Sequence, residues 1–121
     1  NLDLNSLVYL RLTSNQLTSL PESIGNLENL YTLYLNMNQL SFLPNNIGNL
    51  TNLFSLDLIS NQLISLPNSI CNISEYLYLG NNSLCDEYHY DCIYDSSWGT
   101  QDQSNCCEGP NGEPNWTQCE E

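Results

Sequence analysis

The chain contains Leu30-Tyr31-Thr32-Leu33-Tyr34-Leu35-Asn36-Met37-Asn38-Gln39-Leu40, followed by Ser41-Phe42-Leu43-Pro44-Asn45-Asn46-Ile47-Gly48-Asn49-Leu50. The same order of leucine, asparagine and proline occurs before it, from Leu7 to Leu27, and again after it, from Leu53 to Ile73. Each copy is offset from the next by 23 residues. This is an internal repeat, and repeat periods of about 20–50 residues are typical of solenoids, propellers and arrays.

The pattern L-x-x-L-x-L-x-x-N-x-L, followed by L-x-x-L-P-x-x-I-G-x-L, closely resembles the leucine-rich repeat in its 23-residue form, and the resemblance covers residues 2 to 85. It implies an α/β-type solenoid, a short right-handed horseshoe with a parallel sheet on its concave face. It also implies 3-10 or irregular segments on the convex face and a disulfide-rich cap at the C-terminal end. Because such scaffolds serve many unrelated tasks, the resemblance predicts fold better than function.

The spacing within each repeat predicts how its residues are placed. Leucines alternate with variable residues over a short segment, which puts the leucines on the buried side of a strand. The asparagine that follows is expected in a buried position, where its amide must bond backbone groups of the neighbouring coil. Four coils would form such a ladder, at Asn15, Asn38, Asn61 and Asn82. Each Leu-Pro pair then begins the returning convex segment, whose Ile and Leu fill the core from the other side.

The composition changes after residue 84, where the leucines stop and Cys, Asp, Glu, Tyr and Trp replace them. We therefore expect residues 1–84 to form the solenoid, with about four coils and an uncapped N-terminal end. Residues 85–121 are expected to form a cysteine-rich acidic cap or a linker to a following unit. A solenoid needs a terminal cap with a polar outer side, and the residues expected to cover the last coil are Tyr88, Tyr90, Ile93, Tyr94 and Trp98.

The cysteine positions predict one disulfide from geometry. Cys71 takes the convex position of Gly25 and Gly48, and Cys92 follows it at the spacing of the shortened last coil. Coils stack about 5 Å apart, within reach of a disulfide. We therefore expect Cys71 to pair with Cys92. The adjacent Cys106 and Cys107 are not expected to bridge each other, so we expect them to pair separately with the two remaining cysteines, Cys85 and Cys119.

Composition also limits the compartment and the partners. Six cysteines and four N-x-S/T sequons indicate a secreted, glycosylated, extracellular protein; the sequons are at Asn49, Asn72, Asn81 and Asn115. No apolar run is long enough to span a bilayer. Fourteen acidic residues against one basic residue, Arg11, give a formal charge of −13. Because nucleic-acid affinity rests on Lys and Arg, no nucleic-acid partner is expected.

The strand alternation predicts which side chains line the concave face. In the middle of that face, the only basic side chain lies two strands from an aspartate, with a tyrosine between them and another beyond. Stacking and hydrogen bonding to a protein or a glycan are therefore available. The candidate binding residues are Tyr9, Arg11, Tyr34, Asp57, Tyr76 and Tyr78. The alternative is that aromatic and β-branched residues simply suit an exposed sheet.

Catalysis and metal binding receive little support. One His, no Lys, and no Ser or Cys arranged beside that His argue against an enzyme. No cofactor is expected, and a zinc site at His89 is disfavoured because no paired C-x-x-C is present. The acidic residues from Asp86 to Asp91, with Asp95 and Asp102, could hold Ca²⁺ through carboxylate oxygens. A solvated acidic cap is the alternative.

Two functions are consistent with these features of the sequence. The resemblance implies a non-catalytic secreted module for protein or glycan interaction. Alternatively, the chain is a structural subunit or repeating unit that packs head to tail in an extracellular filament or tandem array. Such packing would cover the uncapped Leu2, Leu4, Leu7, Leu10 and Leu12.

A second resemblance concerns the end of the chain. Asn105-Cys106-Cys107 and Asn115-Trp116-Thr117-Gln118-Cys119-Glu120 are similar to the cysteine cap that precedes extracellular plant-type leucine-rich repeats. This similarity implies that the chain is one period of something longer.

Overall fold

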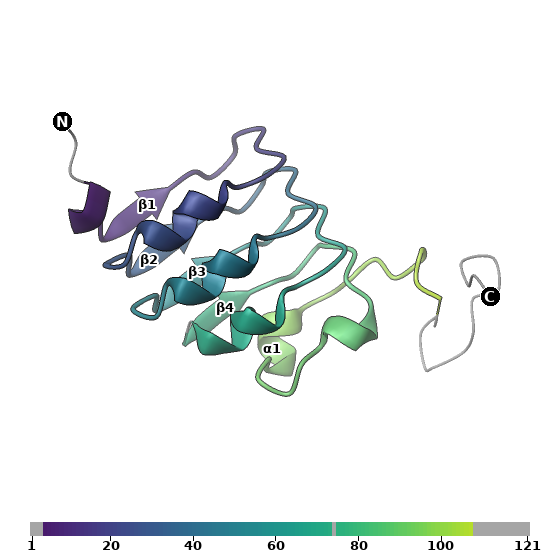
Figure 1. The fold of residues 1–121 in the computed structure, drawn as a ribbon. Helices are drawn as coiled ribbons and strands as arrows, with labels where there is room; N and C mark the ends of the chain where they lie inside the picture. The colour runs from purple at the N-terminus through teal and green to yellow at the C-terminus, as the bar shows by residue number, and fades with distance from the viewer. Residues whose placement is uncertain (1–3, 74, 108–121) are drawn as a thin grey trace.

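The fold is a stack of coils in which short strands alternate with 3-10 helices, here labelled η. The computed structural model describes residues 4–73 and 75–107. In chain order the elements are η1 (Leu4–Ser6), β1 (Tyr9–Arg11), η2 (Glu22–Asn26), β2 (Thr32–Tyr34), η3 (Asn45–Asn49), β3 (Ser55–Asp57), η4 (Asn68–Asn72), β4 (Tyr76–Tyr78), η5 (Asp86–Tyr88) and α1 (Asp95–Trp98). Figure 1 shows the strands side by side in one layer and η2, η3 and η4 stacked in a second layer.

The four strands form one parallel sheet in the order β1-β2-β3-β4. Neighbouring strands pair in register with the sequence repeat, so that Leu10 lies beside Leu33 and Leu33 beside Leu56. In the shortened fourth coil, Leu77 takes the matching place beside Leu56. The predicted leucine-rich solenoid with a parallel sheet and 3-10 convex segments is therefore confirmed.

The core lies between the sheet and the 3-10 helices. Leu33 and Leu35 of the second coil are fully buried beneath the sheet, and Ile47 of η3 is fully buried from the opposite side. Each convex helix from η2 to η4 follows a proline with extended backbone; the proline ring fixes φ, and the helix begins at the next residue. The two layers share one hydrophobic cluster, which runs from Leu20 to Trp98.

The asparagines that follow the strands form a buried ladder in three coils. The Asn38 side chain accepts a hydrogen bond from the Leu17 N–H at 3.1 Å and donates to the carbonyls of Leu12 and Leu35, each at 2.9 Å. Asn61 and Asn82 repeat this pattern one and two coils further on. Each amide thereby satisfies backbone groups of two coils that would otherwise be buried without partners.

Asn15 departs from the expected ladder. Its side chain is exposed, and it donates to the Leu12 and Thr13 carbonyls of its own coil. The prediction of a buried position was wrong for this residue, because the described residues provide no coil on its outer side. The ladder within residues 4–73 and 75–107 therefore begins at Asn38.

The segment after β4 imitates a fifth coil. Leu79 N–H donates to Ser97 O and Asn81 N–H donates to Thr100 O, as the equivalent groups do between complete coils. Gln101 occupies the asparagine position, since its amide oxygen accepts from Leu84 N–H and its amide nitrogen donates to Leu79 O. The cap thus continues the backbone hydrogen bonding of the sheet as well as covering the core.

Four of the five residues expected to cover the last coil are buried or partly buried in the core. Ile93 and Trp98 are buried, and Tyr88 and Tyr90 are partly buried against the core. Tyr94 is 72% exposed, so it is not buried against the last coil as Ile93 and Trp98 are. It lies directly before α1, where the backbone turns to bring Trp98 inward instead.

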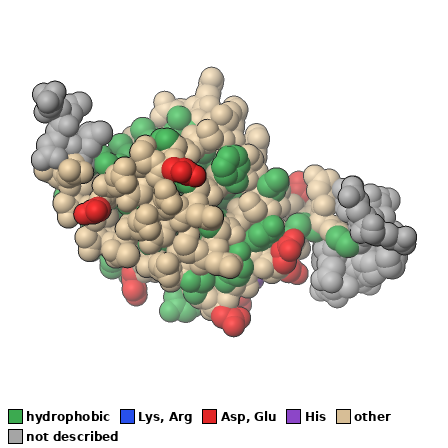
Figure 2. All heavy atoms as spheres, in the orientation of Figure 1, with side chains coloured by type: hydrophobic (Ala, Val, Ile, Leu, Met, Phe, Trp, Pro, Cys, Tyr) green, Lys and Arg blue, Asp and Glu red, His purple; other side chains and the backbone are tan. Residues whose placement is uncertain are grey.

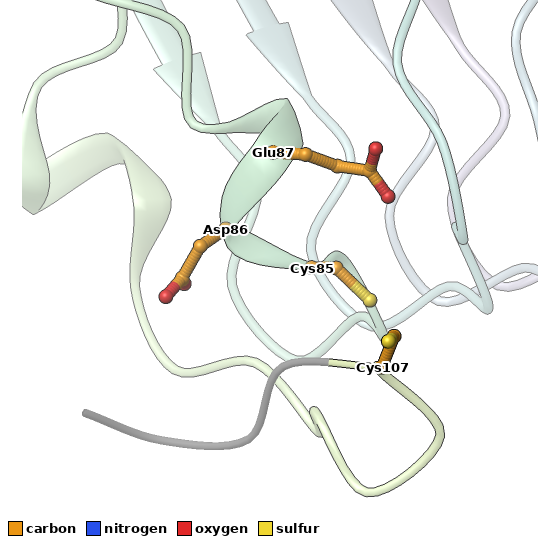
Figure 3. Close-up of a pocket in the computed structure, with 4 residues that line it drawn as sticks. All are labelled: Cys85, Asp86, Glu87 and Cys107. Carbon is orange, nitrogen blue, oxygen red and sulfur yellow. The ribbon is translucent and has the colours of Figure 1, made fainter. Parts of the chain in front are cut away.

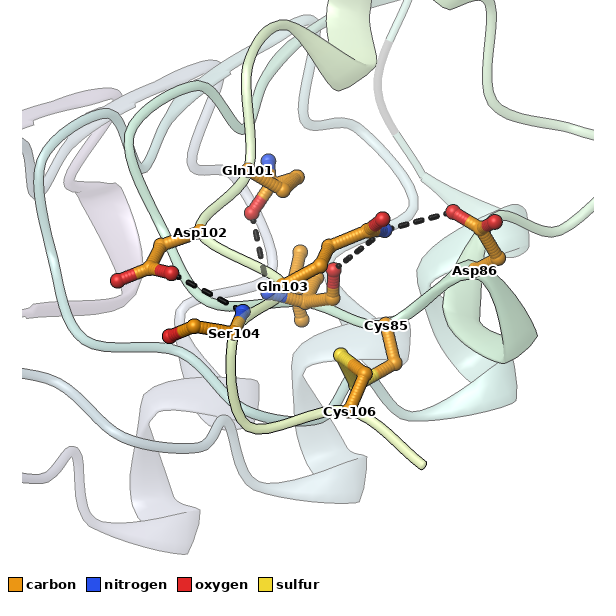
Figure 4. The surroundings of a disulfide bond; sticks show 8 residues. Cys85, Asp86, Gln101, Asp102, Gln103, Ser104 and Cys106 are labelled. Carbon is orange, nitrogen blue, oxygen red and sulfur yellow. Dashed lines mark hydrogen bonds between the residues drawn. A yellow bond between two sulfur atoms is a disulfide. The ribbon is translucent and has the colours of Figure 1, made fainter. Parts of the chain in front are cut away.

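Two disulfides attach the cap, and both join residues 21 positions apart. Cys71 of η4 is bonded to Cys92, which is the pair expected from coil spacing. Cys85 is bonded to Cys106, and Figure 4 shows this bond close to the Gln103 amide that donates to Asp86. Cys107 is also disulfide-bonded, while Cys119 lies outside the described residues. The cap is therefore tied both to the convex helix η4 and to the end of the fourth coil.

In the described part of the chain, no helix is long and apolar enough to cross a membrane.

Candidate functional site

The middle row of the concave face brings four candidate residues into one line across the strands. The register places Arg11 beside Tyr34, Tyr34 beside Asp57, and Asp57 beside Tyr78. Strands in a sheet lie about 4.8 Å apart and equivalent residues point to the same face. The row therefore presents one cation, one carboxylate and two phenol rings to the same surface.

Direct contacts organise the first half of this row. The Arg11 guanidinium carbon lies 5.5 Å from the centre of the Tyr34 ring, within the range of a cation–π interaction. The Tyr9 ring meets the Tyr34 ring edge-on, with centroids 5.6 Å apart. Tyr9 is 52% exposed, and Tyr34 is half-buried. Tyr34 is thereby contacted on two sides and is the aromatic anchor of this face.

Asp57 is a half-buried carboxylate at the centre of the row. One of its oxygens accepts a hydrogen bond from the Ile59 N–H at 3.0 Å. Burial raises the pKa of the Asp57 carboxyl above its ordinary value, and the hydrogen bond from Ile59 partly offsets that rise. The charged form of Asp57 is therefore poorly solvated by its surroundings.

The two tyrosines of β4 differ in their surroundings. Tyr78 is 39% exposed and continues the middle row beyond Asp57. Tyr76 lies at the start of β4, and its ring meets Phe54 edge-on at 4.9 Å. All six candidate binding residues are thus on the described sheet, but Tyr76 belongs to a cluster at the edge where the chain enters the strands.

This edge cluster was missed by sequence reasoning. The Tyr31 and Phe54 rings stack face to face with centroids 5.0 Å apart, and both are exposed. Val8 occupies the same repeat position in the first coil and is also exposed. These three residues recur one repeat apart, each one position before a strand, and that regularity is the signal that could have found them.

The three predicted glycosylation residues that lie in the described part of the chain are at the surface. Asn49 and Asn72 are the last residues of η3 and η4, and both are exposed. Asn81 is exposed in the turn after β4, with φ of 55°. Asn115 lies outside the described residues. Figure 2 shows that the face carrying the 3-10 helices is mostly uncharged and polar, with acidic side chains scattered singly.

The acidic cap does not gather its carboxylates around one point. Within residues 4–73 and 75–107, no group of three or more His, Cys, Asp and Glu side chains is placed to hold a metal ion. A hollow of about 260 Å³ is lined by Cys85, Asp86, Glu87 and Cys107. Figure 3 shows the Asp86 and Glu87 side chains pointing in opposite directions there.

His89 takes part in a structural contact within the cap. Its ring stacks on Trp98 with centroids 4.4 Å apart. Its Nε2 lies 3.1 Å from the Ile93 carbonyl and 3.4 Å from an exposed carboxylate oxygen of Asp95. These contacts hold α1 against the preceding loop.

Comparison with known proteins agrees with this geometry. The chain matches the family model described as "Leucine-rich repeat region" over residues 2–88. No curated protein matches it. Among solved structures, a leucine-rich repeat protein of Leptospira interrogans is similar, with 44% sequence identity and a TM-score of 0.56. That match covers 58% of this chain and 18% of the Leptospira chain, so this chain spans less than a fifth of its relative's length. Because the family model covers well over half of the 121 residues, the chain belongs to the leucine-rich repeat family.

Proposed function

We propose that this chain is a non-catalytic, secreted leucine-rich-repeat module that binds another protein through the middle row of its concave face. Membership of the family supports a role in protein interaction. The observation that carries the assignment to this face is the line Arg11, Tyr34, Asp57 and Tyr78, with Tyr9 packed against Tyr34. Tyrosine and arginine supply much of the binding energy at protein interfaces.

Secretion is supported by the disulfides that attach the cap. Disulfides persist in oxidising compartments and are rare in the cytosol. The exposed sequons at Asn49, Asn72 and Asn81 are accessible to a glycosylating enzyme and lie outside the middle row. Asn49 and Asn72 end the convex helices η3 and η4, so a glycan at either would lie on the layer opposite the sheet. A glycan as ligand, in place of a protein, would use the same tyrosines.

Paired selections test the proposal. A displayed peptide library is selected on the immobilised chain, and a glycan array is probed with the labelled chain. We expect peptide binders whose affinity falls by about tenfold or more in Tyr34→Ala and in Tyr78→Ala. Binding confined to the glycan array would replace protein by glycan as the ligand class.

Phe42→Ala is the matched control. Phe42 is an exposed aromatic side chain, at 49%, but it lies in the segment that leaves the strand layer towards η3. Its truncation should leave the affinity of the selected binders unchanged. If Phe42→Ala abolished binding while both tyrosine variants retained it, the concave assignment would be wrong.

A head-to-tail assembly is the second candidate, and the first coil favours it. Leu7, Leu10 and Leu12 are only partly buried, whereas their counterparts Leu30, Leu33 and Leu35 are fully buried. Covering one such side chain is worth about 1.5–3 kcal/mol at most. A second copy, or a preceding unit of a tandem array, stacked on β1 would supply that cover; Leu2, also assigned to this end, lies outside the described residues.

Light scattering distinguishes the assembly from the binding module. An assembly should give particles far larger than the 13.7 kDa chain, and Val8→Glu, directly before β1, should disperse them. Glu at this exposed position adds a charge to a sheet edge without removing a core residue. A monodisperse monomer at millimolar concentration would remove the head-to-tail hypothesis.

A further inference from the structure

We propose that the concave face recognises a lysine or arginine side chain of the partner protein. Asp57 on β3 would hold this cation, with Tyr78 beside it on β4 and Tyr34 beside it on β2. This inference rests on the proposed function and narrows its partner to a protein with an exposed basic segment. Three features of the described residues support it: the arrangement of the row, the absence of an internal counter-ion, and the position of Arg11.

The arrangement is that of a carboxylate between two aromatic rings. Tyr34 and Tyr78 are the register neighbours of Asp57 on either side, so all three side chains project from adjacent strands to one face. Aromatic faces attract cations through their quadrupole, and a carboxylate attracts them through its charge. An ammonium or guanidinium group placed over Asp57 would gain both interactions at once.

Asp57 has no counter-ion within the described chain. Arg11 is the only Lys or Arg of the sequence, and His89 is the only His. Arg11 lies over the Tyr34 ring, and the strand of Tyr34 separates it from Asp57. His89 lies beside Asp95 in the cap. One Asp57 oxygen accepts from Ile59 N–H, and the other has no hydrogen-bond partner among residues 4–73 and 75–107. Because no cation of the described chain lies beside it, this half-buried carboxylate can be stabilised by a cation supplied by another molecule.

The position of Arg11 determines at which end of the row the partner's lysine or arginine can bind. Its guanidinium already occupies the Tyr34 ring at 5.5 Å from the centroid. A second cation at the same end of the row would be repelled by it. The partner's cation therefore sits towards Tyr78, which makes no ring or cation contact with the described residues and is 39% exposed. Tyr78 is expected to contribute more than Tyr34 to recognition of the cation itself.

The charge of the whole chain favours the same partner. A net charge of −13 attracts basic segments and raises their rate of encounter at low ionic strength. This long-range attraction is shared by every acidic residue, whereas the contact at Asp57 is local. A test must therefore separate loss of one negative charge from loss of the site.

The test is an NMR titration with small cations of known structure. The probes are Nα-acetyl-arginine amide, Nα-acetyl-lysine amide and, as the uncharged counterpart of arginine, Nα-acetyl-citrulline amide. We expect the two cations to shift the Ile59 amide and the Tyr78 ring resonances in a saturable way, and citrulline to leave them unmoved. The Ile59 amide is the reporter of choice because it donates to Asp57.

Matched variants complete the test. Asp57→Asn keeps an oxygen that can accept from Ile59 N–H but removes the charge, and it should weaken cation binding by about tenfold. Glu22→Gln removes the same charge from the exposed end of η2 and should leave the titration unchanged. Equal weakening in both variants, or no saturable shift in the unmodified chain, would overturn the inference. If the peptides selected on the chain still lost affinity in Tyr34→Ala and Tyr78→Ala but not in Asp57→Asn, the proposed function would stand and the cation site would fall.

Discussion

At the scale of single residues, the structure depends on polar groups that are buried with all their partners. Asn38 bonds backbone groups of two coils through one amide, while the equivalent Asn15 bonds only its own turn. Asp57 is the opposite case, because it is half-buried and its hydrogen bond from Ile59 does not compensate for lost solvation. The first kind of residue serves stability, and the second is the kind expected at a binding surface.

Asn38→Leu should lower the free energy of unfolding by about 1–3 kcal/mol, because buried backbone groups of Leu12, Leu17 and Leu35 lose their partners. Asn15→Leu is the control, since Asn15 is exposed, and it should change stability far less. Urea denaturation of both variants measures the difference. Equal losses would mean that the ladder does not stabilise the stack through its buried amides.

Asp57→Asn should raise the melting temperature at pH 7. The pKa of Asp57 is higher in the folded chain than its ordinary value, so the folded state binds the proton more tightly than the unfolded state. As pH rises from the ordinary pKa of Asp57 to its higher pKa in the folded chain, the stability that this group contributes is lost. Above that interval the carboxylate form destabilises the fold. Below the ordinary pKa, both states are protonated and the variant should show no gain. Thermal melts on the two sides of that interval measure this; an equal gain in both would place the effect elsewhere.

At the scale of elements, close stacking of the convex helices sets which small residues are required. A Cβ atom on Gly48 of η3 would clash with the Ser69 Cβ of η4. One on Gly25 of η2 would lie 2.5 Å from the Asn46 carbonyl oxygen of η3. Cys71 takes the same position in η4, where the next element is the cap, and there the side chain forms the disulfide to Cys92.

Gly48→Ala should destabilise the chain by about 1–3 kcal/mol, because η3 and η4 must separate to admit the methyl group. Gly80→Ala provides a matched control, since the nearest atom to a Cβ there is 4.0 Å away. Guanidinium denaturation of the two variants compares them directly. A Gly80→Ala loss as large as that of Gly48→Ala would show that helix stacking is not the cause.

At the scale of the whole molecule, the repeat predicts the fold because each leucine position recurs at a fixed spacing and can bury its side chain only against a neighbouring coil. The same periodicity is enough to align Leu33 with Leu56 and to bring the middle row of the concave face into register. It fails where the local environment is not periodic. Asn15 has the repeat's residue but no outer coil among the described residues, and Gln101 takes the ladder position without the repeat's spacing.

The candidate site was predictable as a set of positions and less so as a set of contacts. Register alone aligns Arg11, Tyr34, Asp57 and Tyr78. The edge-on packing of Tyr9 on Tyr34 depends on side-chain rotamers, which the pattern of leucines does not determine. The poor solvation of Asp57 likewise depends on how closely its neighbours cover it. These contacts, more than the positions, are what distinguish a binding surface from an exposed sheet.

Binding of the partner to the middle concave row can be mapped by an NMR footprint. Amide and aromatic spectra of the chain are recorded with and without a peptide selected on it. We expect the largest shifts on Arg11, Tyr34, Ile59 and Tyr78, with η2, η3 and η4 unaffected. A footprint centred on the 3-10 helices or on the cap, with the middle row unmoved, would contradict it.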